Sequence, residues 1–141
     1  MLSMAKRKGV TMPQMIMKHD VDPKQALIDG VGDISDLQIF NNKLLVAVYI
    51  RPQQTKSGIF LTDQVRDEDR YQGKVGLILK MGPSAFVDPS EQWFKGADFK
   101  LHDWVIFRPS DGWAITINGV LCRVLTDIDV QLQAPNCDMA W

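Results

Sequence analysis

The sequence has little of what marks secreted, membrane-spanning or nucleic-acid-binding proteins. Its two cysteines, Cys122 and Cys137, are too few for the disulfide framework of a small secreted domain. No apolar run approaches the roughly 18 residues that span a bilayer. Lys and Arg (16) nearly balance Asp and Glu (17), so no strong field attracts nucleic acid or anionic lipid. We therefore expect a soluble, cytoplasmic protein that binds protein, with no nucleic acid and no membrane partner.

Residues for catalysis or metal binding are also sparse. His19 and His102 each precede an aspartate, but neither accompanies a recognisable Ser or Cys nucleophile motif. The two His and two Cys are scattered and lack the spacing of metal ligands. Residues 66–70 are rich in charge but lack the glycine-punctuated spacing of a calcium loop, so we expect an exposed, mobile segment there. The sequence thus predicts no enzyme, no cofactor and no metal.

The first 35 residues differ from the rest of the chain. Residues 1–35 hold five of the seven Met and no aromatic residue, which predicts an N-terminal arm outside the core. Within it, Asp22 before Pro23, followed by Gln25 and then Gly30, predicts one short helix that ends at Gly30. A helix this short is marginal alone, so it either docks on an apolar surface, for which the Met-rich stretch is suited, or frays.

From residue 37 onward, short apolar segments alternate with turn residues. The segments expected to be strands are residues 43–50, 74–80, 104–107, 113–117 and 120–125. Asn118-Gly119 favours a two-residue type I′ hairpin, because both central residues of that turn need a positive φ. The pattern predicts an all-β barrel or sandwich over residues 36–133, followed by a tail at 134–141.

Three consecutive large apolar residues, Ile59, Phe60 and Leu61, lie between small polar residues and a highly charged stretch. Neighbouring residues of a strand point to opposite faces, so the three side chains cannot all lie on one side. From the residues alone, a short strand buried on both faces and an exposed apolar loop both remain open.

The order of motifs over residues 37–133 resembles the GroES-type co-chaperonins. Their Lys-Ser-x-Gly-Gly-Ile-Val-Leu loop is similar to residues 56–62 (KSGIFLT), and their Gly-Glu/Lys-Val strand and Gly-Pro turn to residues 72–79 and 81–83. Residues 41–46 resemble the opening strand, 99–107 the Val-Lys-Val-Gly-Asp segment, and 126–129 the closing Asp-Ile strand. The resemblance implies a small GroES-like β-barrel with a mobile loop and with a roof hairpin near residues 86–96.

In function, the resemblance implies a homo-oligomeric co-chaperonin that binds a ring chaperonin of the GroEL type and assists protein folding. Ile59, Phe60 and Leu61 would be the anchors, Ser57 and Gly58 would let the loop bend, and Thr62 would close it. The family assembles as heptamers, and such a ring would present several weakly binding loops at once, so that avidity supplies the affinity.

The sequence departs from the family pattern at three points. The double glycine is single at Gly58, Phe60 replaces Val, and His102 stands where the family has Gly before Asp103. The arm and tail resemble extensions of GroES-like proteins of tailed bacteriophages, which would place the protein in the host cytoplasm or in the virion. The alternative function is therefore capsid decoration, with arm and tail clasping neighbouring subunits. The candidate assembly contacts are Met12, Met15, Met17, Trp93, Phe94 and Trp141.

Overall fold

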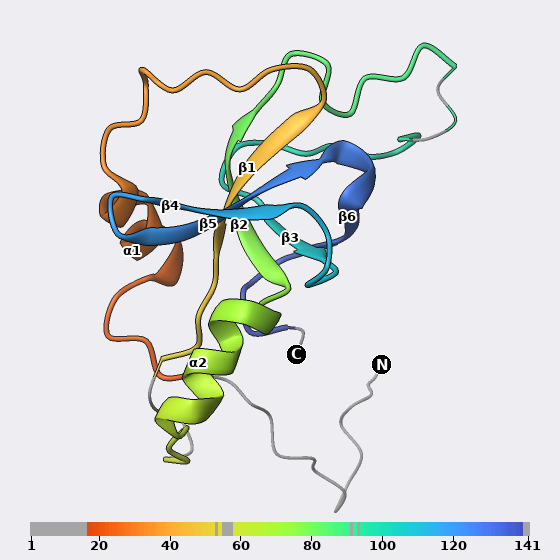
Figure 1. Cartoon of the computed structure of the whole chain (residues 1–141). Helices are drawn as coiled ribbons and strands as arrows, with labels where there is room; N and C mark the ends of the chain where they lie inside the picture. The colour runs from red at the N-terminus through yellow and green to blue at the C-terminus, as the bar shows by residue number, and fades with distance from the viewer. Residues whose placement is uncertain (1–16, 53, 55–57, 91, 93, 140–141) are drawn as a thin grey trace, which may run out of the picture.

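The computed structural model describes residues 17–52, 54, 58–90, 92 and 94–139 (Figure 1). Six antiparallel strands form one sheet in the order β4-β5-β1-β2-β3-β6, accompanied by two α-helices. The β-rich class expected from the sequence is confirmed. The sheet is not closed into a barrel, because β4 and β6 lie at its two edges.

Five of the strands coincide with the segments predicted from apolar runs. The strands are β1 (Lys43–Val48), β2 (Val75–Met81), β3 (Trp104–Phe107), β4 (Trp113–Ile117), β5 (Val120–Thr126) and β6 (Val130–Ala134). The β4-β5 turn has φ angles of 50° at Asn118 and 82° at Gly119, as the predicted type I′ hairpin requires. β6 was not predicted, although its sequence, Val-Gln-Leu-Gln-Ala, alternates apolar and polar residues as strands do.

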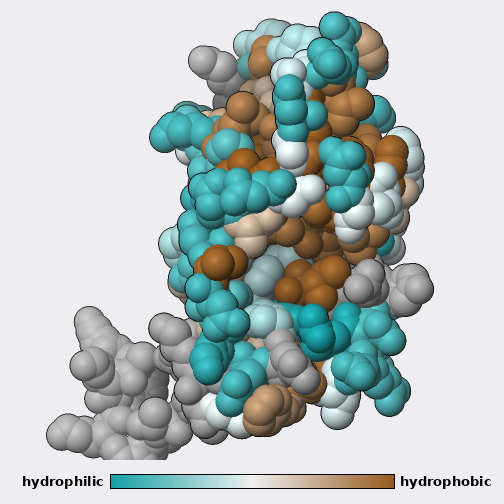
Figure 2. Space-filling model, turned by 90° about the vertical axis from the view of Figure 1, so that its left-hand side faces the viewer, coloured by the Kyte–Doolittle hydropathy of each residue, from teal (hydrophilic) through white to brown (hydrophobic). Residues whose placement is uncertain are grey.

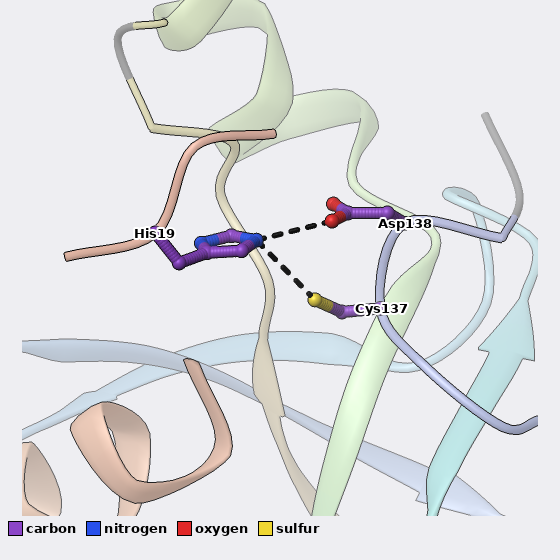
Figure 3. A group of neighbouring side chains, drawn as sticks. All are labelled: His19, Cys137 and Asp138. Atoms are coloured by element: carbon purple, nitrogen blue, oxygen red, sulfur yellow. Dashed lines mark hydrogen bonds and ion pairs between the residues drawn. The ribbon is translucent and has the colours of Figure 1, made fainter. Parts of the chain in front are cut away.

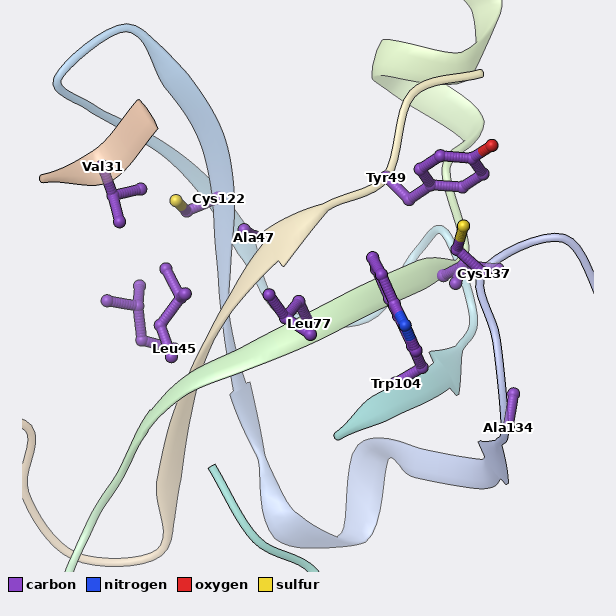
Figure 4. Close-up of a cluster of buried hydrophobic side chains, with 11 residues drawn as sticks. Val31, Leu45, Ala47, Tyr49, Leu77, Trp104, Cys122, Ala134 and Cys137 are labelled. Carbon is purple, nitrogen blue, oxygen red and sulfur yellow. The ribbon is translucent and has the colours of Figure 1, made fainter. Parts of the chain in front are cut away.

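The central strand β1 is buried on both faces. Leu45, Ala47 and Tyr49 belong to one apolar cluster, drawn in Figure 4, whereas Leu44, Val46 and Val48 belong to a second. This division follows from the period of two along a strand. The sheet is thus covered on both sides by other parts of the chain, which explains why the apolar run is continuous.

Helix α1 (Pro23–Val31) covers the first cluster, so the predicted helix docks on the sheet. Its N-terminus is capped by the Asp22 side chain, which accepts a hydrogen bond from the Lys24 backbone N–H at 3.3 Å. Val31 is buried in the core, so this part of the expected arm belongs to the packed domain. Figure 2 shows apolar atoms gathered in the middle of the face that carries α1, flanked by hydrophilic ones.

The predicted end of that helix at Gly30 was wrong. Gly30 lies inside α1, and the helix is capped by Gly32, whose φ is 67°. A Cβ on Gly30 would lie 2.9 Å from the side chain of Val120, so glycine lets the helix approach β5 closely. Tertiary packing therefore explains this glycine, and the local capping pattern does not.

The charged stretch expected to be mobile is helix α2 (Asp63–Gln72). The Thr62 side chain accepts a hydrogen bond from the Val65 backbone N–H at 3.2 Å and caps the helix. Thr62-Asp63, followed by nine residues without Gly or Pro, was an overlooked helix signal. Neither described helix has the length and apolar character to cross a membrane.

The described residues of 86–96 form turns, so the roof hairpin expected there is not found. The Asp88 carboxylate accepts hydrogen bonds from the backbone N–H groups of Ser90 and Gln92, which favours turns over strand pairing. Residues 126–129, expected as a closing strand, instead contain a 3-10 turn, η2 (Asp127–Asp129), before β6. There the buried Asp127 carboxylate accepts hydrogen bonds from Asn42 and from the backbone of Phe86.

Candidate functional site

The apolar tripeptide lies directly before α2, whose N-cap is Thr62. Gln54 and Phe60 form an isolated antiparallel bridge, and Gly58 has a φ of 94°, which glycine adopts without strain. We call the described residues of this segment, Gln54 and residues 58–62, the apolar hairpin. Ser57, expected to help the loop bend, lies outside the described residues.

Two of the three expected anchors are exposed. Phe60 is 64% exposed and Ile59 is 48% exposed, whereas Leu61 is half-buried. These values exclude a strand buried on both faces, which was one of the two interpretations left open by the sequence. Gly58 and Thr62, at either side of the tripeptide, are also exposed. The hairpin therefore presents an aromatic and an aliphatic side chain on its surface.

Two hydrogen bonds hold the apolar hairpin and the chain that leads into it. The backbone N–H of Lys18, in the N-terminal arm, donates to the carbonyl of Gln54 at 2.8 Å. The Arg66 side chain of α2 donates to the carbonyl of Arg51, just before the hairpin, at 3.3 Å. The hairpin, α2 and the C-terminal segment lie at the same end of the sheet in Figure 1.

The candidate assembly residues have separate locations. Met17 is fully buried, and Phe94 is half-buried with its ring edge against Phe86, at a centroid distance of 5.4 Å. Phe86 in turn stacks on Phe99 at 4.3 Å. Phe94 also lines a hollow of about 320 Å³. Met12, Met15, Trp93 and Trp141 lie outside the described residues.

The edge strands offer two further surfaces. β4 pairs only with β5, and β6 only with β3, within the part of the chain that the structure describes. Trp113 on β4 and Leu132 on β6 are both exposed large apolar residues. Unpaired edges with exposed apolar side chains are templates for pairing with another chain.

A polar cluster beside the apolar hairpin was not predicted. We call His19, Tyr49, Cys137 and Asp138 the polar clasp, because it joins the arm, the end of β1 and the tail. The His19 Nε2 atom lies 3.1 Å from the Asp138 Oδ2 atom and 3.9 Å from the Cys137 Sγ atom (Figure 3). The Tyr49 hydroxyl donates to the Asp138 Oδ1 atom at 2.6 Å and lies 3.2 Å from the same histidine nitrogen.

The clasp does not have the geometry of a Cys-His-Asp catalytic relay. In such a relay the thiol and the carboxylate contact different ring nitrogens, so that a proton can pass through the imidazole. Here the carboxylate and the thiol both approach Nε2. Burial and the neighbouring Asp138 raise the pKa of the Cys137 thiol to about 12, which keeps it protonated near neutrality.

Burial, together with the hydrogen bond to Asp138, also raises the pKa of the Tyr49 hydroxyl above its ordinary value. Tyr49 therefore acts as a donor to the carboxylate at neutral pH. The His19, Cys137 and Asp138 ligand atoms all lie within 4.8 Å of one another, which makes this group a candidate metal site.

Sequence spacing could not have revealed the clasp, because His19 and Asp138 are 119 positions apart. The expectation of no metal depended on that spacing, and it stays a prediction. His102, the other histidine, lies in a turn where its backbone N–H donates to the carbonyl of Ile78 at 2.7 Å.

No family model matches the chain, and no curated protein matches it.

Proposed function

We propose that this chain is a divergent GroES-like protein that binds another polypeptide through the apolar hairpin. The observation that carries the proposal is the exposure of Ile59 and Phe60 on a turn whose base is held by hydrogen bonds. Large apolar side chains exposed together at a defined position are typical of a protein-binding surface. The partner that best fits the resemblance of residues 56–62 is a ring chaperonin of the GroEL type.

Two turns support the resemblance at residues where the family has glycine. His102, which replaces the family's Gly, has a φ of 70°, a conformation that favours glycine. Gly82, in the Gly-Pro turn, packs so closely that an added Cβ would collide with the carbonyl oxygens of Phe40 and Asn41. Both positions thus favour glycine for a physical reason, which is a positive φ at residue 102 and close packing at Gly82.

One apolar hairpin binds weakly by itself. Burying one Ile or Phe side chain yields about 1.5–3 kcal/mol, so Ile59 and Phe60 together supply about 3–6 kcal/mol before the costs of association. Assembly of several copies would multiply the contacts without changing any of them. The outer edges of β4 and β6, which no described strand pairs, carry exposed Trp113 and Leu132, and we propose that copies assemble through them.

The test is inhibition of the ATPase of a GroEL-type ring chaperonin by the full chain at stoichiometric concentration. We expect inhibition by the wild type and none by Phe60→Asp, because a carboxylate cannot enter an apolar groove. Phe40→Asp is the matched control, since Phe40 is the same residue type and is 62% exposed, but lies away from the hairpin. Failure of the wild type to inhibit, or equal loss in both variants, would overturn the proposal.

The capsid alternative makes a different prediction. If the protein decorates a virion, it should be present in purified particles at a copy number that fits capsid symmetry. Residues 17–19 and 137–138, the described ends of the arm and the tail, contact each other within one chain. This contact does not favour a role in which both segments clasp neighbouring subunits.

A further inference from the structure

The polar clasp brings together the three types of atom that bind transition metals in proteins. A histidine nitrogen, a cysteine sulfur and a carboxylate oxygen converge from the arm and from the tail (Figure 3). Cys137 is buried, and the side chains of His19 and Asp138 are 19% and 12% exposed. The site is thus mostly shielded, while an ion can still reach it from solvent.

Two of the three separations between ligand atoms are close to those of a metal centre, and all three atoms lie within 4.8 Å of one another. With zinc bonds of about 2.0–2.2 Å to nitrogen and oxygen and 2.3 Å to sulfur, a tetrahedral site places neighbouring ligand atoms about 3.3–3.6 Å apart. The observed separations from His19 Nε2 are 3.1 Å to Asp138 Oδ2 and 3.9 Å to Cys137 Sγ. Both differ from the ideal range by a few tenths of an ångström, which side-chain rotation can supply.

Hydrogen bonds alone do not account for the three groups that surround the Nε2 atom of His19. A neutral imidazole nitrogen carries either one hydrogen or one lone pair, so it makes essentially one good hydrogen bond. Nε2 nevertheless faces the Asp138 carboxylate, the Tyr49 hydroxyl and the Cys137 thiol. A metal ion between these groups would engage the nitrogen, the oxygen and the sulfur simultaneously.

Tyr49 has the role of an outer hydrogen-bond partner. Its hydroxyl donates to Asp138 Oδ1 and leaves Oδ2 directed toward His19. Such partners orient a ligating carboxylate, and their loss typically lowers metal affinity about 10–100-fold.

We propose that His19 Nε2, Cys137 Sγ and Asp138 Oδ2 bind a divalent transition metal of the zinc class, with water as the fourth ligand. The mixed nitrogen, sulfur and oxygen set favours zinc over magnesium or calcium, which prefer oxygen alone. On binding, the Cys137 thiol loses its proton to solvent and the sulfur forms a bond to the metal. The ion would fasten the arm to the tail, and the site does not depend on the proposed chaperonin partner.

Cobalt(II) is the probe for the experiment, because its bond to a thiolate produces a charge-transfer absorption in the near ultraviolet. The full chain, freed of metal by chelation and kept reduced, is titrated with cobalt(II) and then with zinc. We expect saturation at one cobalt per chain, a charge-transfer band, and loss of the band as zinc displaces cobalt. Absence of the band in the wild type would overturn the proposal.

The chain provides a matched control for two of the ligands. Cys137→Ser should abolish the charge-transfer band, whereas Cys122→Ser should retain it, although both cysteines are buried. His19→Gln should weaken cobalt binding at least tenfold, whereas His102→Gln should not. Retention of the band in Cys137→Ser, or equal effects of both histidine variants, would contradict the assignment.

A measurement on the wild type avoids the risk that a variant fails to fold. X-ray absorption of the zinc-loaded chain should show one sulfur and otherwise nitrogen or oxygen ligands. A ligand shell without sulfur would exclude Cys137 and overturn the site. Tyr49→Phe, which retains the ring, should lower zinc affinity about 10–100-fold without changing that shell.

Discussion

The apolar hairpin and the polar clasp lie side by side and show opposite chemistry. In the hairpin, Phe60 is exposed and forms an isolated β-bridge with Gln54. In the clasp, the polar groups of Tyr49 and Asp138 are largely buried and bonded to each other. The hydrogen bond from Lys18 to Gln54 joins the two regions.

Both regions reverse the usual distribution of side chains, in which apolar groups are buried and polar groups are exposed. Exposed Phe60 contributes little to the stability of the free chain, which is why we propose a partner for it. The buried clasp contributes to stability through its contacts, and its convergence on one histidine nitrogen is why we propose an ion there. Substitutions in the two regions should therefore have different consequences.

The largest effect on stability is expected from substitution of Tyr49, which is buried in the core and hydrogen-bonded to Asp138. Tyr49→Ala should lower the free energy of unfolding by about 3–5 kcal/mol, because the ring is lost. Tyr49→Phe should lower it by about 1.5–3 kcal/mol, because only the hydrogen bond to a carboxylate is lost. Urea unfolding of the metal-free chain measures both losses, and no loss in Tyr49→Phe would show that the hydroxyl contributes nothing.

An intermediate effect on stability is expected at alkaline pH, when the Cys137 thiol of the clasp loses its proton. Cys137 has a folded-state pKa of about 12 against an ordinary value of 9.0, so the unfolded chain loses this proton first. The contribution of the Cys137 thiol to the free energy of unfolding is complete below pH 9. It falls as the pH rises toward 12, by at most about 1.4 kcal/mol per pH unit.

The measurement compares the unfolding free energy of wild type and Cys137→Ser between pH 8 and 10, with a chelator present. Cys122, whose pKa burial raises to about 11, remains in both proteins and cancels in the comparison. A decline of the same slope in both proteins would assign the pH dependence to other groups.

The smallest effect on stability is expected in the apolar hairpin. Phe60→Ser and Phe40→Ser should each change the free energy of unfolding by less than about 0.5 kcal/mol, because both side chains are mostly exposed. Only the Phe60 variant should lose binding to the chaperonin. A loss of stability above about 1 kcal/mol at Phe60 would mean that the hairpin packs on its own chain and is not held available for a partner.

Local patterns were sufficient where backbone preference determines the element. Asn118-Gly119 specified a turn with two positive φ angles, and Asp22-Pro23 specified a helix start, both of which the structure contains. Thr62-Asp63 carried a similar signal for α2, which the high charge of the following residues obscured. The exposure of Ile59 and Phe60 was expected from the resemblance, since their apolar character alone also fitted a buried strand.

The sequence by itself determined the β-rich class and most element positions, because strand periodicity, caps and turn residues act over a few neighbouring positions. Only the tertiary structure decided that Gly30 lies inside a helix against Val120, and that the sheet is open with β4 and β6 at its edges. It also decided that His19 meets Cys137 and Asp138. The physical reason is that no local preference specifies which distant segments meet; that depends on how the whole chain packs.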